Sequence, residues 1–490
     1  MFGTGFNIVA RLLYNVLIAR LLGPRDVGIY YLALTVADLI GVVAAAGMET
    51  TIVRYLAWHR VDGDWGAFRG TLRFAIRVAC VIAALGTLGL FGLAPQVAMG
   101  IFHKPAAIVP LRIMALFVPF YALETLLLAA TQSFNEMKYK ALIESTLNPA
   151  LRLFLILPAF FMNNRLFYVL SVYIFTMLVC TTLAYLALHR CIPVNLRDYL
   201  PRTHYRELVQ YSYPLFFFNI LTLLTLYSDS LFVAHYRSSA EMGIYSVCIR
   251  LVVVTSFILP VINQTWAPLM SEFYRKKQME HVSHNFKLVT LWALQIYIPV
   301  LLMFLIVPGR ILDLFGHGFR TAAPCLVILM VGQFINNLTG PVGLVLTISG
   351  WTKLQFWNAF VIVVLQSILA VVLIPRLGLA GAALANAAAA VSVNLLRVFQ
   401  VWTRLRMQPF SACLLKPLLA GATAFLVAAG ITHGTNLVPI TRLTLVVAAT
   451  MVTYAVGMWL LGIDAHSRMA LRQLRGAMGR AFAQAVQSKS

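Results

Sequence analysis

Long apolar stretches separated by short polar loops recur along the whole chain. Two representative stretches cover residues 166–188 and 357–374, and a bilayer crossing needs about 20 mainly apolar residues. A backbone inside lipid must satisfy its own hydrogen bonds, so these stretches are predicted to be membrane-spanning helices. We count about fourteen of them by this length criterion, at approximately residues 4–22, 29–56, 71–94, 107–132, 144–162, 166–188, 208–234, 243–270, 287–308, 321–349, 354–375, 379–402, 414–432 and 440–462.

Positive charge alternates from loop to loop. The loops after even-numbered spans carry several Lys and Arg residues, whereas most of the others carry one or two, such as Arg165 or Arg442. Cytoplasmic loops of membrane proteins are enriched in these residues, which predicts that both termini lie in the cytoplasm. We expect the protein in the cytoplasmic membrane. Residues 463–490 are predicted to be a basic cytoplasmic tail, either an amphipathic helix on the membrane surface or a disordered segment.

A short motif occurs twice. The chain has Asp-Val-Gly-Ile-Tyr from Asp26 and Glu-Met-Gly-Ile-Tyr from Glu241, each followed by a long apolar span. We therefore expect an all-α polytopic membrane protein with two six-helix lobes related by a repeat. The predicted division is an N-terminal lobe at 1–190, a cytoplasmic linker at 191–207, a C-terminal lobe at 208–403, two additional helices at 404–462 and the tail. Transporters often bind substrate between such halves.

Composition excludes several functional classes. The 490 residues are 61% hydrophobic and 11% charged, with a formal net charge of +22. Most of this charge lies in loops, so it points to membrane orientation and anionic lipid headgroups rather than to nucleic acid. The six cysteines have no paired spacing, and no phosphate-binding loop or zinc motif is present. We predict no catalytic residues, no metal and no cofactor.

Several arginines fall inside apolar runs or at their ends: Arg11, Arg20, Arg112, Arg152 and Arg250. A guanidinium at mid-membrane costs roughly 2.5–3.5 kcal/mol on insertion scales, so such residues usually face a water-filled cavity or a partner. Arg11 and Arg20 lie on opposite helical faces, and we favour Arg11 as the inward one. Cations directed into one cavity would suit an anionic cargo, such as a phosphate-linked lipid that carries sugar.

Acidic and amide side chains also occur within the spans. Asp38 and Glu49 lie on one helical face, about 20° apart. With Glu124 and Asp229 they are candidates for ion coupling or for pairing with the arginines. The amide and hydroxyl candidates are Asn148, Asn219, Thr222, Gln333, Asn336, Asn337 and Asn386. Each could line an aqueous path or join two helices by hydrogen bonds, and the pattern leaves both roles open.

Three segments resemble a known family. They are ARLLGPRDVGIY at 19–30, TIVRY at 51–55 and LIPRLGLAGAALA at 373–385. They are similar to signatures of the bacterial polysaccharide transporter and O-antigen flippase family, within the multidrug/oligosaccharidyl-lipid/polysaccharide exporter superfamily. The resemblance covers roughly residues 4–462. These motifs mark the family but not the cargo.

The resemblance implies a two-lobed transporter that opens alternately to each side of the membrane. It implies that the cargo is a polyprenyl-pyrophosphate-linked oligosaccharide for surface polysaccharide, such as exopolysaccharide or O-antigen. The candidate ligands of its pyrophosphate or acidic sugars are Arg11, Arg54, Arg152, Arg250 and Arg397. Lipid II flippases carry an Arg-Asp pair where this chain has Tyr14-Asn15, which favours an exported polysaccharide over a murein precursor.

Expected partners are the lipid-linked oligosaccharide, membrane lipids, a polysaccharide polymerase and chain-length machinery. The basic segment that often precedes the first span in such proteins is missing, which leaves open a start upstream of Met1. The alternative function is a cation-coupled, multidrug-type extruder of the same fold, which should favour acids over arginines. A membrane-embedded glycosyltransferase would need acidic residues on a sizeable outer loop, and the sequence offers only Asp313 near His317.

Overall fold

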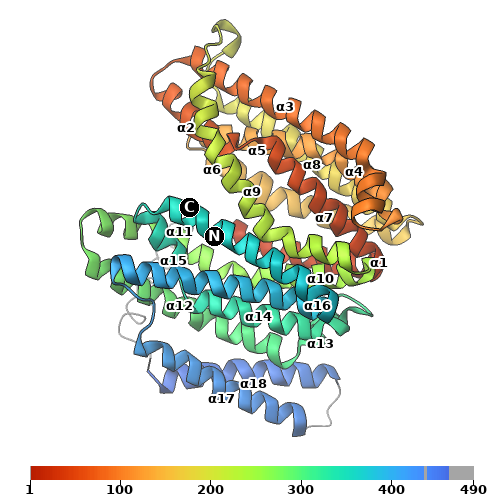
Figure 1. Ribbon diagram of the computed structural model, residues 1–490, viewed down its shortest axis with the longest axis vertical. Helices are drawn as coiled ribbons and strands as arrows, with labels where there is room; N and C mark the ends of the chain where they lie inside the picture. Colours follow the sequence, from red (N-terminus) through yellow and green to blue (C-terminus); the bar gives the residue numbers. More distant parts are fainter. Residues whose placement is uncertain (1, 435–438, 463–490) are drawn as a thin grey trace, which may run out of the picture. The chain divides into compact units, whose positions relative to one another are not determined.

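The computed structural model describes residues 2–434 and 439–462, and in this part of the chain every regular element is a helix (Figure 1). The expectation of an all-α polytopic membrane protein is therefore confirmed. Eleven helical segments within the described residues are long and apolar enough to cross a membrane. The predicted basic tail at 463–490 lies outside the described residues.

The helices follow the predicted spans closely. Their bounds are α1 Phe2–Ala45, α2 Met48–Val61, α3 Trp65–Pro95, α4 Ile108–Ala115, α5 Phe117–Gln132, α6 Met137–Leu142, α7 Asn148–Leu155, α8 Arg165–Cys191, α9 Tyr205–Tyr236, α10 Ser239–Ser256, α11 Ile258–Arg275, α12 Met279–Ile306, α13 Pro308–Asp313, α14 Ala323–Leu338, α15 Val342–Ile348, α16 Thr352–Leu405, α17 Leu415–Gly434 and α18 Pro439–Leu460. The chain forms two compact units. The first contains residues 1–256, 309–332 and 351–393, and the second contains the remainder.

Helix α1 contains two spans, because it turns back at Gly23. This glycine has φ 72° and ψ 171°, and Pro24 follows it. The Tyr31 hydroxyl donates a hydrogen bond of 2.8 Å to Asn15 Oδ1. Sixteen residues of straight helix would separate the two positions by about 24 Å. The chain must therefore reverse between them.

Helix α16 also contains two spans. Gly378 has φ 62° and ψ −135°. A Cβ on Gly381 would lie 2.2 Å from the Leu373 carbonyl oxygen, so the chain reverses here too. Dividing α1 and α16 at these glycines, and counting the shorter apolar stretch Thr444–Leu460 of α18, accounts for the predicted spans.

The two copies of the repeated motif pack against each other in the first unit. A Cβ on Gly28 would lie 1.8 Å from the Ser239 carbonyl oxygen, and one on Gly243 would lie 1.9 Å from the Pro24 carbonyl oxygen. The contact is reciprocal, and only glycine permits it. The two motif copies therefore bring α1 and α10 into close backbone contact.

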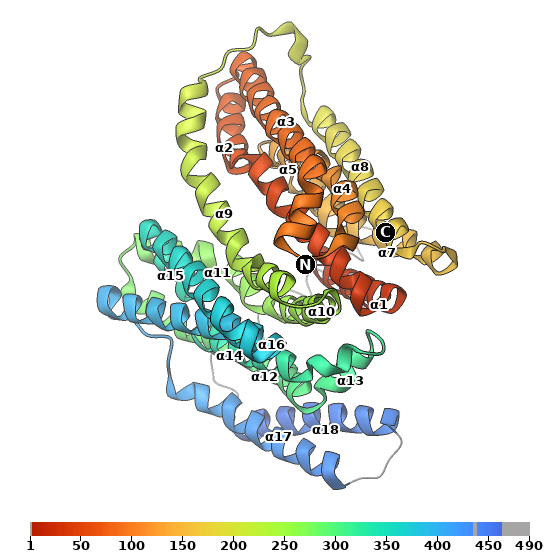
Figure 2. The same ribbon diagram turned by 45° about the vertical axis from the view of Figure 1, so that its right-hand side comes forward.

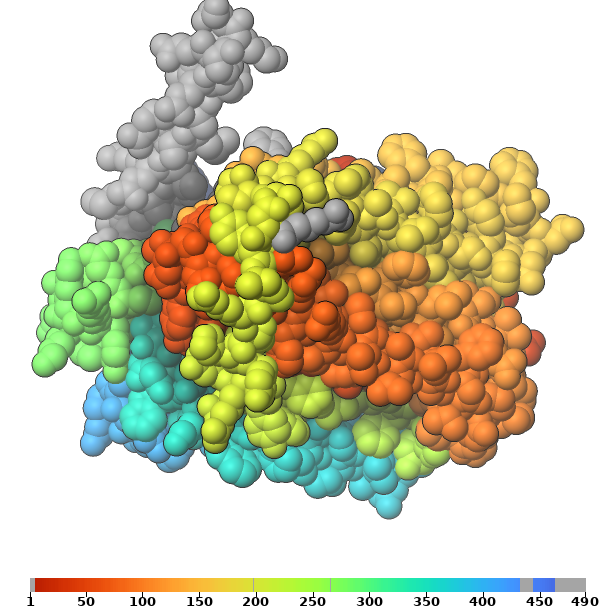
Figure 3. All heavy atoms as spheres, turned by 90° about the horizontal axis from the view of Figure 1, so that it is seen from above, coloured from red at the N-terminus to blue at the C-terminus, as the bar shows by residue number. Residues whose placement is uncertain are grey.

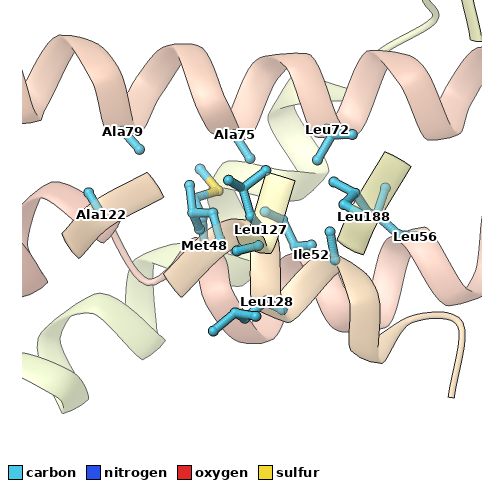
Figure 4. Close-up of a cluster of buried hydrophobic side chains, with 14 of the residues drawn as sticks. Met48, Ile52, Leu56, Leu72, Ala75, Ala79, Ala122, Leu127, Leu128 and Leu188 are labelled. Atoms are coloured by element: carbon cyan, nitrogen blue, oxygen red, sulfur yellow. The ribbon is translucent and has the colours of Figure 1, made fainter. Parts of the chain in front are cut away.

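The core of the N-terminal helices is built from small side chains on α3 that face larger ones on α2, α5 and α8 (Figure 4). Ala75 and Ala79 are buried, whereas Leu88 of the same helix is 70% exposed. In lipid there is little hydrophobic drive between helices, so small residues that allow close approach support packing. The exposed leucine face suits contact with lipid tails.

The segment between α8 and α9 lies over the beginning of α3 (Figure 3). The Arg202 backbone N–H donates to the Gly66 carbonyl at 3.0 Å, and the Arg202 carbonyl approaches Gly70 so closely that a side chain there would clash. Asp64 caps α3 through the Ala67 N–H at 2.8 Å. These contacts order the polar linker, whose cytoplasmic location stays a prediction.

Within the second unit, α12 packs against α17 and α18, which lie side by side (Figure 2). Ile298 of α12 meets the small residues Ala420 and Ala424. The Tyr454 hydroxyl of α18 donates to the Gln295 carbonyl at 3.0 Å. The two additional C-terminal helices are thus fixed to α12.

A side chain at Gly243 should destabilise the first unit. In Gly243→Ala the new methyl group overlaps the Pro24 carbonyl, and overpacking costs typically about 1–3 kcal/mol. We expect a lower melting temperature for the purified protein in detergent. The control is Gly89→Ala in α3, where no atom lies within 4 Å of an added Cβ. Equal melting temperatures for Gly243→Ala and wild type would show that the glycine contact is dispensable.

Candidate functional site

Three of the five candidate substrate-binding arginines come together in the first unit. Arg11 lies on α1, Arg152 on α7 and Arg250 on α10. The Arg11 guanidinium interacts electrostatically with both of the other two. Arg11 is exposed, and the others are half-buried. The first unit therefore gathers positive charge from three membrane-spanning segments.

Tyrosine rings hold two of these arginines. Arg152 Cζ lies 3.7 Å from the ring centroid of Tyr173 on α8, and Arg250 Cζ lies 4.9 Å from that of Tyr31 on α1. Tyr30 contacts both rings edge-on, with centroid distances of 6.4 Å to Tyr173 and 5.0 Å to Tyr31. A continuous row of three buried rings therefore joins the two guanidinium groups.

No carboxylate forms an ion pair with Arg11, Arg152 or Arg250 in the part of the chain that the structure describes. Asp38 interacts electrostatically with Arg250, but its Oδ2 accepts a hydrogen bond of 3.0 Å from the Tyr227 hydroxyl. Glu144 similarly interacts electrostatically with Arg11. The guanidinium groups thus have acids nearby without being directly paired to them.

Asp229 and Asn386 are brought together. Asp229 is fully buried. It accepts hydrogen bonds from the Ser230 N–H at 2.6 Å, the Tyr245 hydroxyl at 2.7 Å and Asn386 Nδ2 at 2.9 Å. These bonds join α9, α10 and α16. The Asp229 carboxylate thus connects three helices by hydrogen bonds, and its role in ion coupling or charge pairing stays a prediction.

The other acidic candidates have different surroundings. Glu49 forms an ion pair with Lys140, whose Nζ lies 3.2 Å from Glu49 Oε1. Glu124 is buried, and its Oε1 has no hydrogen-bond partner. It interacts electrostatically with Arg152, whose Nε also has no partner. Glu124 and Arg152 are therefore close enough to influence each other without a hydrogen bond between those atoms.

Arg54 lies in an aromatic cluster at the middle of α2. Its Cζ lies 4.3 Å from the Trp58 ring centroid and 4.6 Å from that of Tyr211 on α9. Arg20 and Arg112 are engaged elsewhere. Arg20 Nε donates to the Leu314 carbonyl at 2.7 Å, and Arg112 stacks on Phe91.

Arg397 belongs to the second unit, with three of the amide candidates. Arg397 Nη1 donates to Asn394 Oδ1 at 3.3 Å, and Asn394 Nδ2 donates to Asn336 Oδ1 at 3.0 Å. Asn337 Nδ2 donates to the Gln333 carbonyl at 2.9 Å. This network joins α14 and α16. A role for Arg397 beside the other arginines stays a prediction.

The remaining polar candidates show local contacts. Asn148 is buried, and its Nδ2 lies 3.9 Å from Met177 Sδ on α8. Thr222 is exposed, and its hydroxyl donates to the Phe218 carbonyl of its own helix. Asn219 is half-buried. For Asn148 the contact joins two helices.

The tyrosines were not anticipated from the sequence as site residues, although a signal was present. Tyr30 and Tyr245 end the two copies of the repeated motif. Each meets a residue sixteen positions earlier: the Tyr30 hydroxyl lies 3.4 Å from that of Tyr14, and Tyr245 bonds to Asp229. Alignment of the two copies therefore indicates Tyr14 and Asp229 as equivalent positions.

Comparisons with known proteins agree with the fold. The family model described as "Polysaccharide biosynthesis protein" matches residues 1–274, and the MatE model matches residues 214–372. An uncharacterized membrane protein of Methanocaldococcus jannaschii is 20% identical over 405 residues, which is 80% of this chain and 79% of that protein.

Solved structures of low sequence identity share the fold. The lipid II flippase MurJ, in an inward closed conformation, is 15% identical, with a TM-score of 0.73 over 94% of this chain and 98% of that one. An inward-facing multidrug resistance MATE family transporter of the MOP superfamily is 12% identical, with a TM-score of 0.70 over 82% and 94%. A MOP superfamily transporter from Pyrococcus furiosus, described as having a binding pocket of reverse polarity, is 12% identical, with a TM-score of 0.56 over 82% of this chain and 93% of that one.

Removal of the Tyr245 hydroxyl should destabilise the protein. In Tyr245→Phe the buried Asp229 carboxylate loses one of its three donors, and an unsatisfied buried group costs about 1–3 kcal/mol. We expect a lower melting temperature by circular dichroism in detergent. Tyr213→Phe on α9 is the control, because Tyr213 is 63% exposed. An unchanged melting temperature in Tyr245→Phe would rule out Asp229 as a stabilising joint.

Proposed function

Because the chain belongs to the polysaccharide biosynthesis protein family, we propose that it is a flippase for a lipid-linked oligosaccharide. Its cargo is a polyprenyl-pyrophosphate-linked sugar, moved from the cytoplasmic to the outer leaflet for assembly of surface polysaccharide such as exopolysaccharide or O-antigen. The protein is a transporter rather than an enzyme, and it works by alternating access between two six-helix lobes.

The observation that carries this proposal is the group formed by Arg11, Arg152 and Arg250. These side chains come from three membrane-spanning segments and form no ion pair in the described residues. A guanidinium presents N–H donors in a planar fork that matches phosphate geometry. A pyrophosphate group would supply the negative charge that the arginines lack. Arg54 and Arg397 are further candidate contacts for the pyrophosphate or for acidic sugars.

Transport requires a path for a very polar head. Unpaired polar groups are costly in hydrocarbon, so the sugar must cross inside the protein while the polyprenyl tail stays in lipid.

Asp38 and Glu124 are the acids best suited to ion coupling, because Glu49 is paired with Lys140 and Asp229 already accepts three hydrogen bonds. MurJ, which shares the fold, is by its name a lipid II flippase, and this supports a lipid-linked cargo.

The orientation follows from the loop charges. We place both termini in the cytoplasm and the protein in the cytoplasmic membrane, because the loops on that side carry most of the Lys and Arg residues. A polysaccharide polymerase and chain-length machinery would act on the product at the outer face, which makes them the expected partners.

Charge reversal at Arg250 should abolish export. In Arg250→Glu a carboxylate replaces a cation of the arginine group, and like charges repel the pyrophosphate. We expect loss of surface polysaccharide and accumulation of lipid-linked sugar in a deletion strain that carries the variant, measured beside membrane insertion. Arg275→Glu is the control, because Arg275 is exposed at the end of α11. Normal export by an inserted Arg250→Glu protein would discard Arg250 as a cargo residue.

The second candidate is a cation-coupled small-molecule extruder. It is favoured by the MatE match over residues 214–372 and by the shared fold of the MATE transporter. The arginine group opposes it, because cations would repel cationic drugs. We expect the deletion strain to keep wild-type susceptibility to a panel of cationic drugs. Hypersensitivity that the wild-type gene restores, with surface polysaccharide unchanged, would favour the extruder.

A further inference from the structure

We propose that Tyr173 and Tyr31 are positioning residues for the cargo anion. They support Arg152 and Arg250 by their ring faces, in the place where a carboxylate counter-ion would otherwise stand, and so leave the guanidinium N–H groups available for a diphosphate. This inference rests on the proposed function and extends it to residues that do not touch the cargo themselves.

The stacking distances carry the first step. The 3.7 Å between Arg152 Cζ and the Tyr173 centroid, and the 4.9 Å between Arg250 Cζ and the Tyr31 centroid, are within the range of cation–π contact. A cation–π contact holds the guanidinium over the ring without a carboxylate, so both arginines keep N–H groups that no acid occupies among the described residues. These are the groups that bind phosphate oxygens in pairs. A carboxylate partner would occupy the same N–H groups.

The rings are held rigidly, which is the second step. Tyr30, Tyr31 and Tyr173 are 1%, 3% and 7% exposed, so they are too deeply buried to stack on a sugar. The Tyr31 hydroxyl is fixed by its bond to Asn15. Tyr173 contacts Phe117 with a centroid distance of 5.5 Å. Burial on all sides makes these rings a support for the arginines.

The third step concerns the nearest acids. Asp38 accepts a hydrogen bond from Tyr227, and Glu124 lies near Arg152 without an ion pair in the described residues. Tyr227 therefore hydrogen-bonds to Asp38, while the rings of Tyr173 and Tyr31 contact the two arginines. Among the described residues no acid forms an ion pair with these arginines, so an incoming anion does not have to break one to reach the guanidinium groups.

The test measures lipid binding by purified full-length protein in nanodiscs. The probes are undecaprenyl diphosphate and, as the ligand without phosphate, undecaprenol. We expect Tyr173→Leu to weaken binding of the diphosphate by about three- to thirtyfold, the size of a cation–π contribution, and to leave undecaprenol binding unchanged. Tyr173→Phe keeps the ring and should bind the diphosphate like wild type.

The matched control is Tyr168→Leu on the same helix. Tyr168 is half-buried and bonds to the Leu155 carbonyl, and no arginine stacks on it among the described residues. The Tyr168→Leu variant should bind the diphosphate like wild type. Should Tyr173→Leu fail to fold, Tyr31→Leu applies the same test to Arg250, with Tyr31→Phe as its conservative partner.

The two proposals fail in different ways. Wild-type protein that binds undecaprenyl diphosphate no better than undecaprenol would overturn the flippase proposal, and the positioning role with it. Wild-type preference for the diphosphate that survives in Tyr173→Leu would overturn the positioning role alone. Equal loss in Tyr173→Phe and Tyr173→Leu would also overturn it, because the hydroxyl rather than the ring would then be responsible.

Discussion

The positive charge of a guanidinium group inside a membrane-spanning segment needs a stabilising partner, and the kind of partner decides what the site can bind. In the first unit, Arg152 and Arg250 are compensated by the faces of Tyr173 and Tyr31. A ring attracts a cation through its quadrupole without adding a negative charge. The arginines are therefore held in place while their charge remains unneutralised by a direct partner, and this distinguishes them from Lys140, which is paired with Glu49.

The turn at Gly23 and the glycine contact between α1 and α10 make this arrangement possible. The turn places Asn15 beside Tyr31. The reciprocal contact of Gly28 and Gly243 lets the two backbones approach closely at this point, and nearby Tyr31 on α1 lies against Arg250 on α10. The partners of the two motif tyrosines differ in charge. Tyr30 meets the neutral phenol of Tyr14, whereas Tyr245 meets the carboxylate of Asp229.

The length of the apolar stretches was sufficient to predict the helices, because a lipid-exposed backbone admits few other structures. The turns at Gly23 and Gly378 were implicit in the short intervals between predicted spans. The sequence also singled out Arg11, Arg152 and Arg250 as candidates, because a charged residue in an apolar stretch is easily recognised. It could not find their partners: Tyr31 and Tyr173 look like ordinary apolar residues of a span, and only the folded chain shows which ring lies beneath which cation. Asp229 was equally ambiguous until its three donors were known.

Separation of acids and arginines also bears on coupling. If Asp38 formed an ion pair with Arg250, an anionic cargo would have to displace the Asp38 carboxylate in order to bind. Asp38 would then lose its partner only when cargo arrived. The Tyr227 hydrogen bond instead gives Asp38 a partner whose hold does not depend on the arginines. Protonation of Asp38 would then change the field at Arg250 without changing its stacking on Tyr31, because the two interact electrostatically but share no bond. If the proposed function holds, a coupling cation at Asp38 and the cargo anion would influence each other's affinity by charge alone.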